Sequence, residues 1–100
     1  MARRVRFARR ASADLDAIRA FIAREAGPAR ASAFVLRIVE RCEKLAQFPL
    51  RGTARPELRP LLRTMGLGRR LTIAFRVDAE GVVILRILYG GRSLERAFRS

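Results

Sequence analysis

Residues 70–89 read RLTIAFRVDAEGVVILRILY and carry the strongest structural signal in the chain. Within residues 70–77 and 83–89 the odd-numbered side chains are apolar, an alternation typical of strands with one buried face. A three-residue loop at 79–81 would bring the apolar side chains of both strands onto the same face. This stretch therefore predicts an antiparallel hairpin. The predicted pairs are Val77 with Val83, Phe75 with Leu85, Ile73 with Ile87 and Leu71 with Tyr89.

Two amphipathic helices precede this hairpin. Ser12 is predicted to cap the first helix, whose apolar residues recur at helical spacing until Gly27 ends it. Pro28 opens the second helix. That helix should stop near Phe48, because Pro49 disfavours helical geometry in the residue before it. Since the link between them is so short, the two helices should form an antiparallel helical hairpin.

A breaker-rich connector and two further strands complete the predicted architecture. Residues 4–9 alternate like a short first strand, and residues 61–67 form another candidate strand. Between them, the connector at residues 48–60 reads FPLRGTARPELRP, and its three prolines exclude a helix or a central strand. We predict one α+β domain over residues 1–100, ordered βααβββ. In it, the helical hairpin packs on one face of a small antiparallel sheet, and a short tail follows.

The chain is strongly basic. It has 22 Lys and Arg against 9 Asp and Glu, a net charge of +13, which attracts polyanions or an acidic protein partner. It has no histidine and one cysteine, which excludes the usual Cys/His metal sites, His-based triads and an intramolecular disulfide. No apolar run approaches the length of a membrane span. We therefore expect a soluble cytoplasmic protein that uses no metal or other cofactor and binds no membrane.

The even-numbered face of the predicted hairpin mixes apolar side chains with arginines. Because the helices should cover only the opposite face, we expect this reverse face to be open and to serve as a docking groove. An amphipathic partner segment would bury apolar side chains there while its carboxylates meet the arginines. The residues predicted to bind such a segment are Ala74, Arg76, Ile84, Arg86 and Leu88. An ordinary solvated face with scattered hydrophobic side chains is the alternative.

Several segments, in order, resemble the RelE/ParE superfamily of type II toxins, and the ParE branch most closely. They are Phe48-Pro49, Gly52, the PELR run at 56–59 and LRILYGGRSLE at 85–95. The resemblance covers nearly the whole chain and implies a toxin encoded beside a cognate antitoxin, whose acidic or amphipathic segment neutralises it. For the ParE branch it implies growth inhibition through DNA gyrase. For the RelE branch it implies cleavage of mRNA on the ribosome.

Within this resemblance, the C-terminal residues favour binding over catalysis. Arg92 resembles the arginine that follows the last strand in the family, but Phe98 stands where the nuclease branch tends to have tyrosine. Phenylalanine cannot transfer a proton, so we expect a toxin that binds its target rather than an enzyme. If the chain is instead a ribosome-dependent endoribonuclease, the candidate catalytic residues are Arg92, Arg70 and Tyr89.

Arginines outside the predicted core are the candidates for contact with the target. The predicted target-binding residues are Arg59, Arg63, Arg69, Arg92 and Arg96. The target is gyrase in the main hypothesis and the ribosome in the alternative. A third hypothesis is a basic nucleic-acid-binding module without toxicity. It is weakened because most aromatic side chains have core assignments, which leaves few for stacking on bases.

Overall fold

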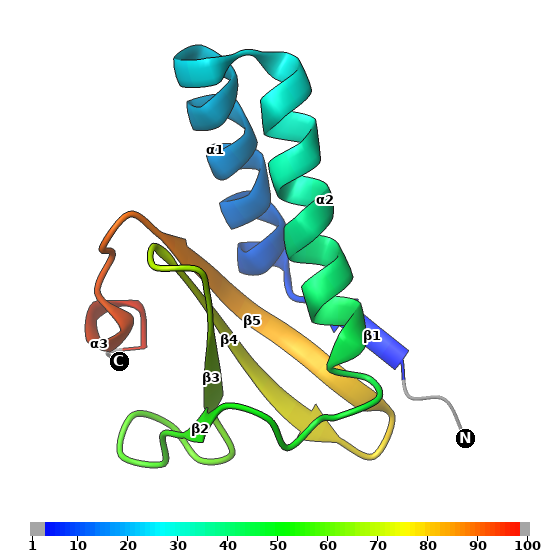
Figure 1. Ribbon diagram of the computed structural model, residues 1–100. Coiled ribbons are helices and arrows are strands. Elements are labelled where there is room, and N and C mark those ends of the chain that lie inside the picture. Colours follow the sequence, from blue (N-terminus) through cyan, green and yellow to red (C-terminus); the bar gives the residue numbers. More distant parts are fainter. Residues whose placement is uncertain (1–3, 99–100) are drawn as a thin grey trace.

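In the computed structural model, which describes residues 4–98, a helical hairpin stands on one face of a five-stranded sheet (Figure 1). The predicted α+β class and the helical hairpin are confirmed. The elements are β1 (Arg4–Phe7), α1 (Arg9–Ala26), α2 (Pro28–Lys44), β2 (Thr53–Ala54), β3 (Arg63–Leu67), β4 (Leu71–Asp78), β5 (Gly81–Tyr89) and α3 (Leu94–Ala97). Among residues 4–98, no helix combines the length and apolar character needed to cross a membrane.

The sheet is mixed, with strand order β1-β5-β4-β3-β2. β1 pairs in parallel with β5, whereas the other neighbours are antiparallel, so the predicted antiparallel sheet holds only for β2 to β5. The prediction also missed β2, because the connector's prolines conceal a two-residue strand. Gly52 precedes β2 with φ 79°, and a Cβ there would collide with the Thr64 carbonyl of β3. Glycine thus lets the connector approach the sheet edge.

The β4–β5 hairpin follows the predicted register in only one half. Leu71 and Ile73 pair with Tyr89 and Ile87 as predicted, but a β-bulge follows Ala74. Beyond the bulge the register shifts by one residue, so Phe75 pairs with Ile84 and the loop contains only residues 79–80. The predicted pairs of Phe75 with Leu85 and of Val77 with Val83 are therefore wrong. Residues 82–85 are all apolar, so alternation could not locate the bulge within them.

The main core lies between the helical hairpin and the sheet. Its fully buried side chains include Ile38 and Cys42 from α2 and Ile73 and Phe75 from β4. Burial raises the pKa of the Cys42 thiol to about 12, which keeps this cysteine protonated and unreactive at neutral pH. Cys42 therefore serves as a small core side chain, as its position on the apolar stripe predicts.

α1 begins earlier than the sequence predicts. The helix starts at Arg9 with Ala8 at the N-cap position, so the predicted cap Ser12 lies inside the first turn. The Ala8 N–H donates to the Ile84 carbonyl at 2.9 Å, which joins the end of β1 directly to the start of α1. Pairing with β5 therefore sets the start of the helix, and α1 begins without a side-chain cap.

A second, smaller core covers the reverse face of the sheet. Leu62, immediately before β3, and Phe98, after α3, pack on Ala74, and all three are buried. The Arg59 guanidinium lies over the Phe98 ring, 4.9 Å from its centroid. The tail that carries Phe98 forms the short helix α3. Its N-cap is Ser93, whose hydroxyl oxygen accepts a hydrogen bond from the Arg96 N–H.

This second core makes the expectation of an open reverse face wrong. Ala74 and Leu88 are buried by the protein itself, and Ile84 lies in the main core because the bulge turns it toward the helices. Arg76 is bonded to Asp78, and Arg86 is bonded to Asp14. Antitoxin binding at these five predicted residues stays a prediction.

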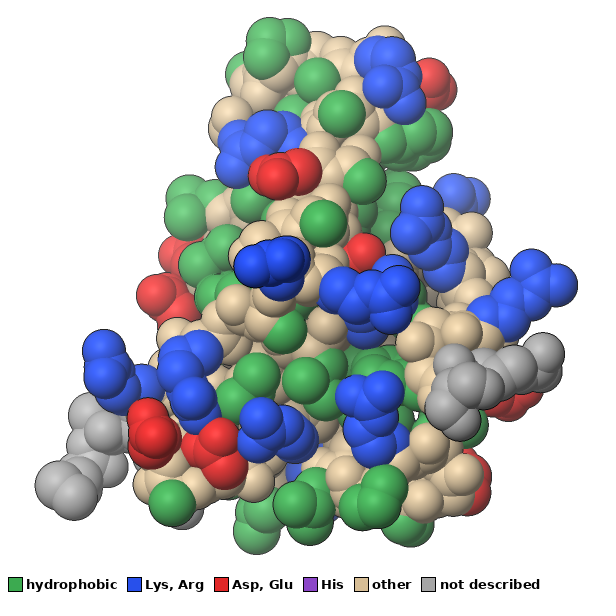
Figure 2. Space-filling view, turned by 180° about the vertical axis from the view of Figure 1, so that it is seen from behind, with side chains coloured by type: hydrophobic (Ala, Val, Ile, Leu, Met, Phe, Trp, Pro, Cys, Tyr) green, Lys and Arg blue, Asp and Glu red, His purple; other side chains and the backbone are tan. Residues whose placement is uncertain are grey.

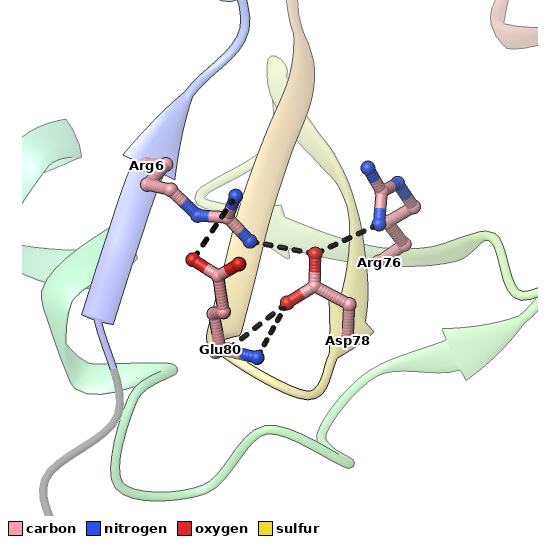
Figure 3. Close-up of polar contacts among 5 residues, drawn as sticks. Arg6, Arg76, Asp78 and Glu80 are labelled. Carbon is pink, nitrogen blue, oxygen red and sulfur yellow. Dashed lines mark hydrogen bonds and ion pairs between the residues drawn. The ribbon is translucent and has the colours of Figure 1, made fainter.

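One carboxylate ties the β4–β5 turn to the edge strand (Figure 3). Asp78 Oδ2 accepts hydrogen bonds from Arg6 of β1 at 2.6 Å and from Arg76 at 3.1 Å. Asp78 Oδ1 accepts the backbone N–H groups of Glu80 at 2.9 Å and Gly81 at 3.1 Å. The hydrogen bond from Arg6 above all, together with those from the Glu80 and Gly81 N–H groups, lowers the pKa of Asp78 from its ordinary 3.8 to about 2.

This lowered pKa gives a testable pH dependence. Because the folded protein holds Asp78 ionised more strongly than the unfolded chain does, the stabilisation is complete above the ordinary pKa of 3.8 and is lost as the pH falls toward about 2. We expect the free energy of unfolding of the wild type to fall more steeply over this window than that of Asp78→Asn. Urea unfolding at a series of pH values measures the difference, and parallel curves would contradict this role for Asp78.

Candidate functional site

A cleft of about 440 Å³ opens between α1 and the C-terminal end of β5. Its rim carries Arg24 from α1, Arg70 from the β3–β4 turn and Arg92 from the segment after β5. Ile18 and Ile87 supply apolar lining. The cleft thus combines three guanidinium groups with apolar surface, an arrangement suited to an anionic ligand that also has apolar parts.

Backbone geometry places Arg70 and Arg92 in the same cleft. The Gly90 N–H donates to the Arg70 carbonyl at 2.9 Å, which ties the end of β5 to the β3–β4 turn. Gly90 and Gly91 both adopt the left-handed region, with φ 73° and 85°. This double-glycine turn redirects the chain after Tyr89, which brings Arg92 to the rim of the cleft.

Two further hollows adjoin this cleft and extend its positive charge. One, of about 190 Å³, shares Arg70 and Tyr89 with the cleft, and the other, of about 600 Å³, shares Arg92. We call the exposed arginines of the three hollows the arginine cluster. Its members are Arg24, Arg37, Arg69, Arg70, Arg92 and Arg96.

Within residues 4–98, no member of the arginine cluster forms an ion pair. On the right of Figure 2, arginine or lysine side chains gather between the helical hairpin and the C-terminal segment. Unpaired guanidinium groups around adjoining hollows create a positive potential that attracts phosphates and carboxylates. The surface is therefore suited to binding an anionic macromolecule.

Tyr89 lies where the cleft and the smaller hollow meet. Its ring packs edge-on against Phe34 of α2, with centroids 5.5 Å apart, and at a tilt against Phe21 of α1, 6.1 Å away. The side chain faces the helices, as its odd-numbered position predicts, and it is half-buried. Tyr89 therefore joins both helices to the end of the sheet, a structural role that leaves part of it at the cleft.

A buried ion pair joins Asp14, which lines the cleft, to Arg86 of β5. Arg86 donates two hydrogen bonds to the Asp14 carboxylate, at 2.8 and 3.0 Å, and the Ile87 N–H donates a third at 2.8 Å. The hydrogen bonds to Asp14 raise the pKa of Arg86. The sequence patterns did not predict this pair, although Asp14 interrupts the apolar stripe of α1 between the buried residues Ala11 and Ile18. A carboxylate on an apolar stripe was the available signal.

Comparison with known proteins identifies the family. The family model described as the ParE toxin of the type II toxin–antitoxin system parDE matches residues 5–94.

The chain belongs to the ParE toxin family.

Known relatives agree with this assignment. Toxin ParE3 of Caulobacter vibrioides is 39% identical over 83 residues, which are 83% of this chain and 82% of that toxin. A solved structure of the chromosomal ParDE system of P. aeruginosa superimposes with a TM-score of 0.77 at 36% identity, over 88% of this chain and 96% of the matched one. The RelBE2 toxin–antitoxin complex of Mycobacterium tuberculosis shares the fold, with a TM-score of 0.63 at 24% identity over 90% and 100% of the two chains.

In this ParE toxin, the structure brings together only part of the predicted site. The three residues predicted for a ribonuclease, Arg70, Tyr89 and Arg92, all line the cleft. Of the predicted target-binding residues, Arg69 and Arg96 join Arg92 in the arginine cluster. Whether any of these side chains contacts a target stays a prediction.

The other two predicted target-binding residues of the ParE toxin lie outside the cluster and support its connector. Arg59 stacks on Phe98, and Arg63 donates to the backbone carbonyls of Leu50 at 2.6 Å and Arg51 at 3.1 Å. Their guanidinium groups therefore hold the connector and the tail in place.

Two members of the arginine cluster, Arg24 and Arg37, were not predicted from the sequence. In a sequence, an arginine on the exposed face of a helix cannot be distinguished from an ordinary solvated residue. The fold places Arg24 at the cleft and Arg37 at the adjoining smaller hollow. Among residues 4–98, no group of three or more His, Cys, Asp or Glu side chains could hold a metal ion.

Proposed function

We propose that this ParE toxin inhibits growth by binding and poisoning DNA gyrase in the cytoplasm, and that a cognate antitoxin neutralises it. The observation that carries the proposal is the arginine cluster, six exposed cations without carboxylate partners in residues 4–98. Gyrase bound to DNA presents phosphates and acidic side chains, which such a surface attracts. Membership of the ParE family supports gyrase over other anionic targets.

The chemistry of the cleft supports binding rather than turnover. Cleavage of RNA through its own 2′-hydroxyl needs a general base near that group. The chain has no histidine, and the Asp14 carboxylate is committed to Arg86 and the Ile87 N–H. Tyr89 is packed between two aromatic rings. Since an arginine guanidinium stays protonated, a ribonuclease would depend on Tyr89 as its base, which makes it the weaker alternative.

The comparisons support a protein antitoxin as the partner. The P. aeruginosa match is a ParDE toxin–antitoxin system, and the M. tuberculosis match is a toxin–antitoxin complex. Since this toxin carries a net charge of +13, an antitoxin segment with acidic residues would complement it. We therefore propose that an acidic or amphipathic segment of the antitoxin binds the toxin and blocks growth inhibition.

Expression without the antitoxin tests the proposed function. We expect induction to arrest growth, co-expression of the neighbouring antitoxin gene to restore it, and purified toxin to produce linear plasmid in a gyrase reaction. Arg92→Ala should weaken both growth arrest and the formation of linear plasmid about tenfold, because it removes one of three cations at the rim of the cleft. Growth arrest with intact plasmid and cleaved mRNA would instead support the ribonuclease. Normal growth on induction would contradict both.

A further inference from the structure

A second surface, which shares no lining residue with the three hollows of the arginine cluster, is apolar and exposed. Residues 4–98 contain five exposed large hydrophobic side chains, and three of them, Phe48, Leu50 and Leu61, lie in the segment between α2 and β3. Leu50 is 72% exposed and Phe48 is 56% exposed. Hydrophobic side chains line the lower edge of Figure 2, where Figure 1 places the connector. This concentration in one segment indicates an interaction surface.

Part of this segment forms a hollow, which we call the connector patch. The hollow has a volume of about 590 Å³, and its apolar lining is Phe48, Pro49, Leu50 and Val77. Val77 also packs against the main core. An apolar side chain placed in the hollow would therefore extend the main core outward from the edge of β4.

The connector patch is held in shape by polar contacts. The Arg63 guanidinium donates to the Leu50 carbonyl at 2.6 Å, and the Arg51 N–H donates to the Phe48 carbonyl at 3.2 Å. The Arg51 guanidinium lies over the Phe48 ring, 5.2 Å from its centroid. The backbone of Phe48 and Leu50 and the Phe48 ring are thus held in place before any partner arrives, which reduces the entropy lost on binding.

We infer that the connector patch docks an acidic, amphipathic segment of the antitoxin, an inference that rests on the proposed antitoxin partner. An apolar side chain of the segment fills the hollow, and a neighbouring carboxylate pairs with Arg51, which forms no ion pair within residues 4–98. Hydrophobic contact supplies the affinity, and the charge selects an acidic partner.

Charge and lining chemistry argue against two other occupants. A second copy of this chain would also carry a net charge of +13, and a symmetric contact would bring two Arg51 side chains together. A single-stranded nucleic acid would use an aromatic face for stacking, but Arg51 already covers the Phe48 ring and the lining holds no other aromatic side chain.

The test compares two exposed leucines changed in the same way. Leu50→Glu adds a negative charge in the connector patch, and Leu36→Glu adds one on α2, where Leu36 is 58% exposed. Both substitutions lower the net charge of the protein by the same amount, so a general loss of positive charge would affect the two variants alike. Calorimetry with the full-length antitoxin encoded beside the toxin gene should show binding weakened at least tenfold in Leu50→Glu and less than about threefold in Leu36→Glu.

The outcomes separate the inference from the proposed antitoxin partner. Equal affinities for the wild type and Leu50→Glu, or equal losses in both variants, would overturn the connector patch as a docking site and leave the partner standing. Failure of the wild type to bind the antitoxin would contradict both the connector patch as a docking site and the proposed antitoxin partner. Gel filtration of the free toxin completes the test, because a dimer that Leu50→Glu dissociates would identify a second copy as the occupant. Thermal unfolding of both variants verifies that they are folded.

Discussion

Replacing Arg70 and Arg92 together by glutamate is expected to abolish growth inhibition while the protein stays folded. The two side chains belong to different segments, the β3–β4 turn and the chain after β5, and they meet at one cleft. The double change converts two of its three rim cations into anions. Truncating one partner of a buried charge pair at an interface typically weakens the binding free energy by about 2–5 kcal/mol. Reversing the charge at two positions should therefore reduce affinity for an anionic target at least ~100-fold.

A matched pair of substitutions separates this effect from net charge. Arg19 and Arg30 are exposed on α1 and α2 and line none of the three hollows of the arginine cluster. Changing both to glutamate alters the net charge equally, and this control should remain toxic. Colony counts after induction measure the toxicity, and thermal unfolding of each purified variant verifies the fold. Equal toxicity of the two double variants would contradict a target-binding role for the cleft.

Replacing Asp14 by alanine is expected to destabilise the protein more than any other single change considered. The substitution leaves the Arg86 guanidinium, whose side chain is only 14% exposed, without its carboxylate, and it leaves the Ile87 N–H unbonded. Removing one partner of a buried ion pair typically costs about 3–5 kcal/mol. Since small domains have total stabilities of about 5–15 kcal/mol, the variant should unfold easily.

Asp16 supplies the control for this prediction. It lies two residues further along the same helix and is exposed, so Asp16→Ala should change the free energy of unfolding by less than about 0.5 kcal/mol. Asp14→Asn should fall between the two, because its amide oxygen can still accept a hydrogen bond. Urea unfolding of the three variants gives the order directly. A loss in Asp14→Ala no greater than in Asp16→Ala would show that the buried pair contributes little stability.

The sequence predicted those parts of the fold that depend on local pattern. The helices follow from the spacing of apolar residues, and Gly27 with Pro28 marks the short link between them. The bulge could not be located, because a run of four apolar residues, 82–85, carries no alternation to fix its register. The β1–β5 pairing depends on contact between distant segments, which local patterns do not encode.

The site was less predictable because arginine is abundant throughout this chain. A pattern can suggest that an arginine is exposed, but it cannot tell Arg92, which lines the cleft, from Arg63, which binds connector carbonyls. The reverse face of the sheet shows the same limit. Its burial depends on Phe98, a tail residue that reaches the sheet only after the double-glycine turn and α3.

A titration of toxin against a fixed amount of gyrase tests the central claim most directly. A toxin that acts by binding should act stoichiometrically, whereas an enzyme acts at a small fraction of the concentration of its substrate. We predict that linear plasmid accumulates as toxin is added and levels off near a small whole-number ratio of toxin to gyrase. The account would be contradicted if gyrase turned over normally at every ratio while sub-stoichiometric toxin cleaved mRNA in a ribosome reaction.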